Sequence, residues 1–322
     1  MKNKSLEIWY LMTLTFTLTF LILITLINFQ TSNKIGQTER EEGLQSHKEK
    51  NNTPIFGGIA FVISYIIIIT FLLLINHISL LIYLLLIFPM ICFSLLGFID
   101  DFLILKRKKN DGIKPNIKFL IQIIIAIIYF IIYLIFNFDT SINFIFFKID
   151  LKFLYGIFIL LAFSGFTNAT NLTDGIDGLL GGTLSIIMIG IYIISNNYFM
   201  REIIAIIFSG LCAFLYFNLP KAKIFMGDTG SLALGSLFVS IMIIMKSELY
   251  LFIFGLVYII ETLSVMLQVY YFKKTNGKRL FKMAPLHHHF EIVLNSERKT
   301  LILFYIFTIF TVIVGILVKK FS

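Results

Sequence analysis

Ten apolar runs divide this chain, and each is about long enough to cross a bilayer as an α-helix. Lipid offers an open backbone no hydrogen-bond partner, so a chain with such runs spans a membrane as helices. The content of 58% hydrophobic and 14% charged residues excludes a soluble globular protein. We therefore predict an all-α, polytopic protein, a single integral membrane domain over residues 1–322, with about ten transmembrane helices near 6–29, 55–75, 79–99, 117–138, 151–169, 179–195, 202–219, 229–245, 249–272 and 300–318.

The distribution of basic residues between the loops predicts the orientation of these spans in the membrane. Of the 27 Lys and Arg residues, 19 fall in the loops that follow the odd-numbered spans. By the positive-inside rule those loops are cytoplasmic, and both termini are predicted to be extracytoplasmic. Lys2 and Lys4 argue weakly for the reverse orientation. The two longest polar segments, 30–54 and 273–299, are expected to pack over the cytoplasmic mouth.

Acidic residues gather at the predicted cytoplasmic ends of three spans. Asp100 and Asp101 end the third run, where the negative end of a helix dipole disfavours two carboxylates unless a cation compensates them. Asp174 and Asp177 precede the sixth run, and Asp228 precedes the eighth. A solvated pair at the membrane exit is the alternative for Asp100 and Asp101. The convergence of separate motifs on one surface favours an active site.

Asp174 and Asp228 also have an ordinary structural interpretation, because Asp is a preferred residue at the N-cap of a helix. Capping does not explain the glycines that accompany these acids, which allow a ligand to approach the backbone closely. Helix N-termini attract phosphate as well. Taken together, the motifs favour a Mg²⁺–diphosphate site with Asp228, Asp100 and Asp101 as candidate metal ligands.

Small residues continue from these motifs into the following spans, as Gly178-x-x-x-Gly182 and Ser231-x-x-x-Gly235. This spacing lets transmembrane helices pack closely. We expect it to bring the sixth and eighth spans together, so that their acids approach one another.

Histidines and lysines complete the candidate set. Three consecutive histidine side chains splay apart, and no Cys or H-x-x-x-H spacing accompanies them, so zinc is weakly supported. Imidazoles that reach substrate phosphates or hydroxyls are the favoured interpretation for His287, His288 and His289. Lys50 and Lys118 are candidate phosphate ligands, whereas most of the other loop lysines would form a solvated rim.

The ordered set of motifs resembles the polyprenyl-phosphate N-acetylhexosamine-1-phosphate transferases, and within them the muramoyl-pentapeptide branch of bacterial cell-wall synthesis. The resemblance covers nearly the whole chain and is highly specific. Its motifs are Ser46-His47, Lys50, Thr53-Pro54 with Gly57-Gly58, Gly97 to Phe102, Lys118, Asn168 to Gly178, Asn218, Phe225 to Gly235, Glu261 to Gln268 and Pro285 to Glu291.

The resemblance implies a reaction in peptidoglycan synthesis. Phospho-N-acetylmuramoyl-pentapeptide would pass from its uridine diphosphate carrier to undecaprenyl phosphate with Mg²⁺, giving lipid I and UMP. It also implies a multi-pass protein of the bacterial cytoplasmic membrane, an active site facing the cytoplasm, and a homodimer. A direct displacement and a phospho-enzyme on an Asp both remain open at this point.

The resemblance also assigns roles residue by residue. Asp228 would hold Mg²⁺, and Asp100 or Asp101 would deprotonate or orient the lipid phosphate. His287 and His288 would sit beside the phosphates. The uridine diphosphate pocket would be lined by Lys50, Asn171, Asp174, Asp177, Asn218, Gln268 and Phe225, with Phe225 stacking on uracil.

The chain departs from the family pattern at Asn51-Asn52, at Ile55-Phe56 and around Asn295-Ser296, where an expected Trp-Pro is absent. These departures affect loop shape more than charge and leave every Asp and His in place. A sister enzyme that uses another uridine diphosphate amino sugar is the nearest rival interpretation. A lipid-carrier transporter or flippase and an inactive homologue are the others. A transport site would lie near the midplane on broken helices.

Overall fold

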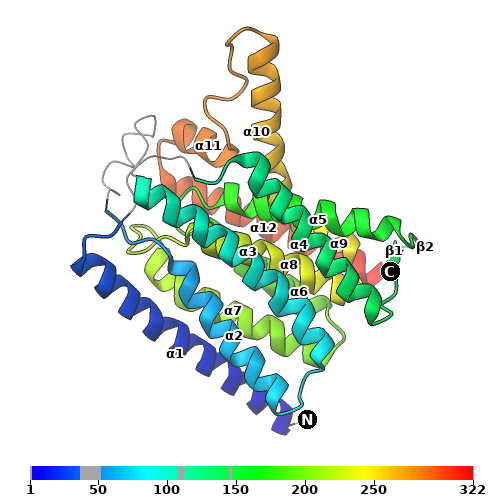
Figure 1. Ribbon diagram of the computed structural model, residues 1–322. Coiled ribbons are helices and arrows are strands. Elements are labelled where there is room, and N and C mark those ends of the chain that lie inside the picture. The colour runs from blue at the N-terminus through cyan, green and yellow to red at the C-terminus, as the bar shows by residue number, and fades with distance from the viewer. Residues whose placement is uncertain (1, 37–51, 108–111, 145–146, 322) are drawn as a thin grey trace.

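A computed structural model gives the fold, and it describes residues 2–36, 52–107, 112–144 and 147–321. Lys50, a predicted phosphate ligand, lies outside the described residues, as does most of the polar segment 30–54. The helices form one bundle, and both chain ends lie at the end of the bundle away from the start of α2 (Figure 1).

Nearly all described residues within the predicted spans are helical, which confirms the all-α, multi-span prediction. Eight of the described helices are long and apolar enough to cross a membrane. These eight are α1 (Lys2–Ser32), α2 (Gly57–Leu74), α3 (Leu80–Arg107), α4 (Pro115–Ile135), α5 (Leu154–Thr173), α7 (Tyr198–Asn218), α8 (Gly227–Ile244) and α12 (Glu297–Phe321).

The remaining helices differ from the ten-span prediction in two places. The predicted span 179–195 corresponds to α6 (Leu179–Ile194), whose 16 residues are fewer than a full crossing needs. The predicted span 249–272 is not one helix but α9 (Glu248–Phe254) and α10 (Leu256–Lys274), bent by 67°. By length and apolar composition, the described residues therefore contain eight candidate spans, or nine if the bent pair counts as one.

The bend lies at Gly255, where the ring of Phe166 packs so closely that a Cβ would overlap it. Beyond the bend α10 leaves the bundle and projects past the other helices (Figure 1). The chain then returns through a loop to α11 (Leu286–Leu294), a short helix that carries the three histidines. The segment 273–299 is thus partly helical, and its helix α11 packs on α10 and α12.

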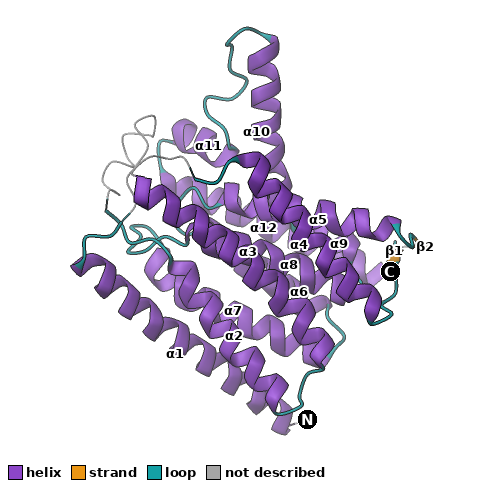
Figure 2. Ribbon diagram, viewed as in Figure 1, coloured by secondary structure: helices purple, strands orange, loops and turns teal. Residues whose placement is uncertain are grey.

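A two-stranded hairpin was not expected from the sequence. Strands β1 (Ser141–Asn143) and β2 (Lys148–Asp150) pair antiparallel between α4 and α5, with Ile142 opposite Ile149 (Figure 2). Three-residue strands carry too little alternation to stand out beside long apolar runs. Lys246 links the segment just before β1 to the start of α9. Its Nζ lies 2.9 Å from the carbonyl oxygen of Asp139 and 2.6 Å from Glu248.

Helix α8 forms the centre of the bundle, and small residues explain how its neighbours approach it. A Cβ on Gly97 of α3 would overlap the backbone of Asp228, and a Cβ on Gly58 of α2 would overlap the backbone of Gly230. Such positions let helix backbones touch, as is common for helices in lipid. The start of α8 is therefore held between α2 and α3.

The expected pairing of the sixth and eighth spans through their small residues is wrong. Gly182 of α6 packs against Tyr305 of α12, and Gly235 of α8 packs against Thr170 of α5. The two motifs bring each helix against a different partner, because the small face of a helix does not specify which neighbour fills it.

Candidate active site

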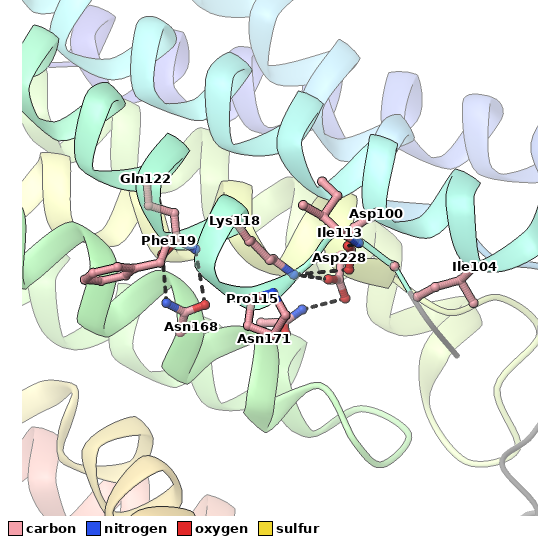
Figure 3. A pocket seen from close by; sticks show the side chains of 11 residues that line it. Asp100, Ile104, Ile113, Pro115, Lys118, Phe119, Gln122, Asn168, Asn171 and Asp228 are labelled. Carbon is pink, nitrogen blue, oxygen red and sulfur yellow. Dashed lines mark hydrogen bonds and ion pairs between the residues drawn. The ribbon is translucent and has the colours of Figure 1, made fainter. Parts of the chain in front are cut away.

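The principal candidate site is a pocket of about 420 Å³ between the end of α3, the start of α4, the end of α5 and the start of α8 (Figure 3). Four of the predicted residues meet there from four helices. The pocket is lined by Asp100, Ile104, Gly112, Ile113, Pro115, Lys118, Phe119, Gln122, Asn168, Asn171 and Asp228.

A lysine lies between two of the predicted acids. The Nζ atom of Lys118 is 2.6 Å from Oδ2 of Asp228 and 3.2 Å from Oδ2 of Asp100 (Figure 3). Asn171 completes the arrangement by donating from Nδ2 to Oδ1 of Asp228 at 2.6 Å. Two carboxylates that converge on one cation, with a pocket beside them, suit the binding of a charged ligand. We call Asp100, Asp228 and Lys118 the carboxylate–lysine centre.

Asp100 and Asp101 are adjacent in sequence but serve different neighbours. Asp100 faces the pocket and accepts a hydrogen bond from the backbone N–H of Ile113. Asp101 is buried and accepts from the N–H of Asp228 at 3.0 Å, from the N–H of Thr229 at 2.9 Å and from the Thr229 hydroxyl at 2.7 Å. Asp101 therefore satisfies free amides in the first turn of α8 from another helix.

The N-cap interpretation of Asp228 is consequently wrong. Asp228 lies inside the first turn of α8, and the residue at the cap position, Met226, makes no side-chain cap. The carboxylate of Asp101 takes the place of a local cap, which leaves the Asp228 side chain free to face Lys118 and Asn171.

This difference predicts opposite results for the two neighbouring acids. Asp101→Ala leaves buried donors at the start of α8 without an acceptor and should cost about 2–3 kcal/mol of stability. Asp100→Asn keeps most of the local packing and should lower activity with little change in the unfolding temperature. Thermal unfolding in detergent checks both variants, and an Asp101→Ala protein as stable as the wild type would contradict the anchoring role.

Residues 174–178 form the turn between α5 and α6, which we call the α5–α6 turn. Asp174 lies at the C-terminal end of α5, so the N-cap interpretation of Asp174 is also wrong. Helix α6 begins only after Gly178, whose φ of 79° is readily adopted by glycine. Burial raises the pKa of the Asp174 carboxyl well above its usual range, and the nearby carboxylates of Asp228 and Asp101 raise it further.

Several partners hold the α5–α6 turn in place. Asp177 accepts from the N–H of Ala222 at 2.8 Å, and its own N–H donates to Glu297 at 2.8 Å. Asn218 accepts from the N–H of Gly178 at 2.9 Å and donates to the carbonyl of Ile224. Both side chains were predicted to line a nucleotide pocket, and in this structure both make intramolecular contacts.

The histidines separate into different environments. The rings of His287 and His288 lie only 4.2 Å apart, which contradicts the expectation that all three splay apart. His287 is fully buried against Glu261, whereas His289 accepts at Nδ1 from the N–H of Lys282. Among the residues that the structure describes, no three His, Cys, Asp or Glu side chains gather as a metal-binding group.

Two further predicted residues lie outside the pocket. Gln268 of α10 accepts from the N–H groups of Leu280 and Phe281 and donates to the carbonyl of Phe281. It therefore holds the loop after α10 against that helix. Phe225 is half-buried, and its backbone pairs with Pro54 and Gly57 at the entry to α2.

Sequence reasoning missed an amide pair in the pocket wall. Gln122 and Asn168 exchange hydrogen bonds of 3.2 and 2.9 Å between α4 and α5 (Figure 3). The available signal was the spacing of Gln122 one helical turn after Lys118, which puts both side chains on one face of α4. Glu297 was missed as well, because it contacts the α5–α6 turn from a distant part of the chain.

Comparison with known proteins gives the family. Residues 82–246 match the model of glycosyl transferase family 4. The chain is 46% identical over 309 residues to a phospho-N-acetylmuramoyl-pentapeptide-transferase of Staphylococcus saprophyticus, covering 93% of this chain and 95% of the relative. It is 45% identical over 316 residues to the protein of that name from Staphylococcus aureus strain MSSA476, covering 94% and 96%. The chain belongs to glycosyl transferase family 4, among the phospho-N-acetylmuramoyl-pentapeptide-transferases.

Proposed function

We propose that this protein transfers phospho-N-acetylmuramoyl-pentapeptide from its uridine diphosphate carrier to undecaprenyl phosphate, giving lipid I and UMP in peptidoglycan synthesis. Near-full-length similarity to proteins named for this transfer supports the proposal. The single structural observation that carries it is the carboxylate–lysine centre at the edge of a pocket. Phosphoryl transfer needs positioning and charge neutralisation more than a protein nucleophile, and this centre is suited to both.

The donor set at this centre fits Mg²⁺. Proteins bind Mg²⁺ through one or two carboxylates, with substrate phosphates and water supplying the other ligands. The oxygens of Asp228 and Asp100 already converge on one cationic group, the Lys118 ammonium. We therefore propose Asp228 and Asp100 as the ligands. Asp101 is a poor ligand because three hydrogen bonds from α8 occupy its oxygens.

The side chains around the carboxylate–lysine centre have different roles in the proposed transfer. A bound Mg²⁺ would neutralise diphosphate oxygens and the charge that develops on the leaving UMP. Lys118, whose ammonium lies beside both acids, would add positive charge for the phosphates of the substrates. Asn171 holds Asp228 through its amide, and Ser231 holds Asn171 in turn at 3.0 Å. Asp100 orients the phosphate of the acceptor lipid.

The nucleotide side of the site is proposed from the remaining matched positions. Phe225 stacks on uracil, and Lys50 and His288 contact the diphosphate. Burial and the nearby carboxylates of Asp228 and Asp101 raise the pKa of the Asp174 carboxyl, and in its protonated form it would donate a hydrogen bond to the nucleotide. Asp177, Asn218 and Gln268 support the walls of this pocket through the contacts described above.

An apolar groove offers a place for the prenyl chain. A pocket of about 360 Å³ between α5, α9 and α10 is lined by Phe158, Leu161, Ala162, Gly165, Phe166, Ala169, Phe252, Ile259, Thr262 and Leu263. It follows α5 toward Asn168 and Asn171, and Asn171 lies six positions after Gly165, a rise of roughly 9 Å along the helix. A lipid phosphate at the carboxylate–lysine centre would place its chain along this groove.

Filling the groove should therefore impair use of the lipid acceptor selectively. Nothing lies within 4 Å of a Cβ built on Gly165, so Gly165→Leu places its side chain in the groove without a clash at the Cβ. We expect the KM for undecaprenyl phosphate to rise about tenfold while the KM for the nucleotide changes little. Initial rates measured against each substrate check this, and an equal change in both KM values would contradict the assignment.

The remaining assignments follow from the same proposal. The site faces the cytoplasm of a bacterial inner membrane, where the basic loops and the nucleotide would both lie. We also propose a homodimer, which the family resemblance alone supports.

Purified protein in detergent tests the reaction. With the muramoyl-pentapeptide nucleotide and undecaprenyl phosphate we expect UMP and a lipid-linked product of the matching mass. Product only with the uridine diphosphate-N-acetylglucosamine donor would move the protein to the sister branch. Failure with both donors, together with movement of the lipid carrier across a vesicle bilayer, would replace the enzyme with a flippase.

A further inference from the structure

Glu261 is a buried acid that none of the roles above uses. It lies in α10 with no exposed surface, and His287 of α11 is buried to the same degree. One carboxylate oxygen accepts from the backbone N–H of His287 at 3.1 Å, and the other lies 3.2 Å from Nδ1 of the same residue. A charged group in a membrane helix is costly, so the pairing of the Glu261 carboxylate with His287 points to a specific role.

The carboxylate of Glu261 determines the tautomer of the His287 imidazole. An ionised carboxylate only accepts hydrogen bonds, so the proton of His287 lies on Nδ1. The other ring nitrogen, Nε2, is buried and has no hydrogen-bond partner among the described residues. It lies against Gly175, where an added Cβ would overlap the Nε2 atom. The ring thus connects α10 to the α5–α6 turn.

We infer that Glu261 is a positioning residue, which fixes the orientation and the tautomer of His287 and through that ring supports the α5–α6 turn. The inference rests on the proposed function, because that turn carries Asp174 and Asp177. His287 has no exposed surface in this structure, so it acts on the substrate pocket through Gly175. A side chain at Gly175 would displace the ring, which explains a glycine at this position without a ligand.

The effect should appear mainly in binding of the nucleotide donor. Glu261→Gln keeps the size of the side chain but can donate as well as accept, so it no longer dictates the Nδ1–H tautomer. We expect a rise of about tenfold in the KM for the nucleotide, with a smaller change in kcat. Gly175→Ala should give the same KM change, whereas Glu261→Asp should recover part of the wild-type value.

Nitrogen NMR of histidine-labelled protein measures the tautomer without any activity. The signal of His287, identified by its loss in His287→Gln, should show Nδ1–H in the wild type and lose that signature in Glu261→Gln. A matched control is Glu202→Gln, because Glu202 is also fully buried and pairs with a histidine, His77, at 2.6 Å. This control should leave both the His287 signal and the nucleotide KM unchanged.

The outcomes separate the two proposals. An unchanged His287 signal and KM in Glu261→Gln would overturn the positioning role, even if wild-type transfer is normal. Absence of transfer in the wild type, with a His287 tautomer that depends on Glu261, would instead overturn the proposed function and leave the assigned geometry standing.

Discussion

Asp228→Asn is expected to abolish measurable transfer. Asparagine keeps the shape of the side chain but removes the negative charge that faces Lys118 and the proposed metal. Metal-assisted charge stabilisation is worth several kcal/mol, so at 1.36 kcal/mol per factor of ten the rate should fall by at least ~10³. The fold should persist, because Asp101 rather than Asp228 satisfies the amides at the start of α8.

Two measurements make this result interpretable. UMP release gives the activity, and the unfolding temperature in detergent shows whether the variant is folded. Asp150→Asn, a change of an exposed acid on the distant β2 strand, should retain full activity. A folded Asp228→Asn protein that works within a few-fold of the wild type would remove Asp228 from the proposed metal site.

Gly97→Ala should have the second large effect, although the change adds one carbon atom. A Cβ at this position overlaps the backbone carbonyl of Asp228 and the N–H of Thr229, neither of which can rotate away. Overpacking of this kind costs about 1–3 kcal/mol. It also moves the start of α8 away from Asp100, and a displacement near 1 Å can cost about a hundredfold in rate.

Gly165→Ala is the matched control for stability. Both glycines lie inside transmembrane helices, but a Cβ at residue 165 has nothing within 4 Å. Alanine there should raise the unfolding temperature slightly, because it favours the helix by about 1 kcal/mol. Equal unfolding temperatures for Gly97→Ala and the wild type would show that α3 does not hold the start of α8 in the way described.

Much of the architecture could be predicted because the bilayer imposes it. Apolar runs of membrane length become helices whatever their neighbours are, so nearly all of the predicted spans correspond to helices. The ends of those runs also placed Asp100, Lys118 and Asp228 at one end of the bundle, and the family resemblance added Asn171. The structure brings all four to one pocket. Successive helices of an antiparallel bundle run in opposite directions, so the order of the helices, with the short helix α6 included, is enough to assign these residues to one end.

Contacts between helices could not be predicted in the same way. Asp100 faces the pocket, whereas Asp101 accepts hydrogen bonds from the first turn of α8. This difference depends on which neighbour faces each side chain, and hydrophobic periodicity does not contain that information. The N-cap preference of Asp suggested that Asp174 and Asp228 cap the helices that follow them. In the structure, Asp174 ends α5 and Asp228 lies inside the first turn of α8. At the bend, Gly255 likewise packs against Phe166, a residue far away in sequence.

Removal of the divalent cation tests the central claim most directly. UMP release by the purified wild-type protein should stop when a chelator removes Mg²⁺ and return when Mg²⁺ is added back in excess, while the unfolding temperature changes little. Asp228→Asn should show no recovery at any Mg²⁺ concentration. Wild-type UMP release that continues at its full rate without a divalent cation would contradict the proposal that Asp100 and Asp228 hold a metal for the transfer.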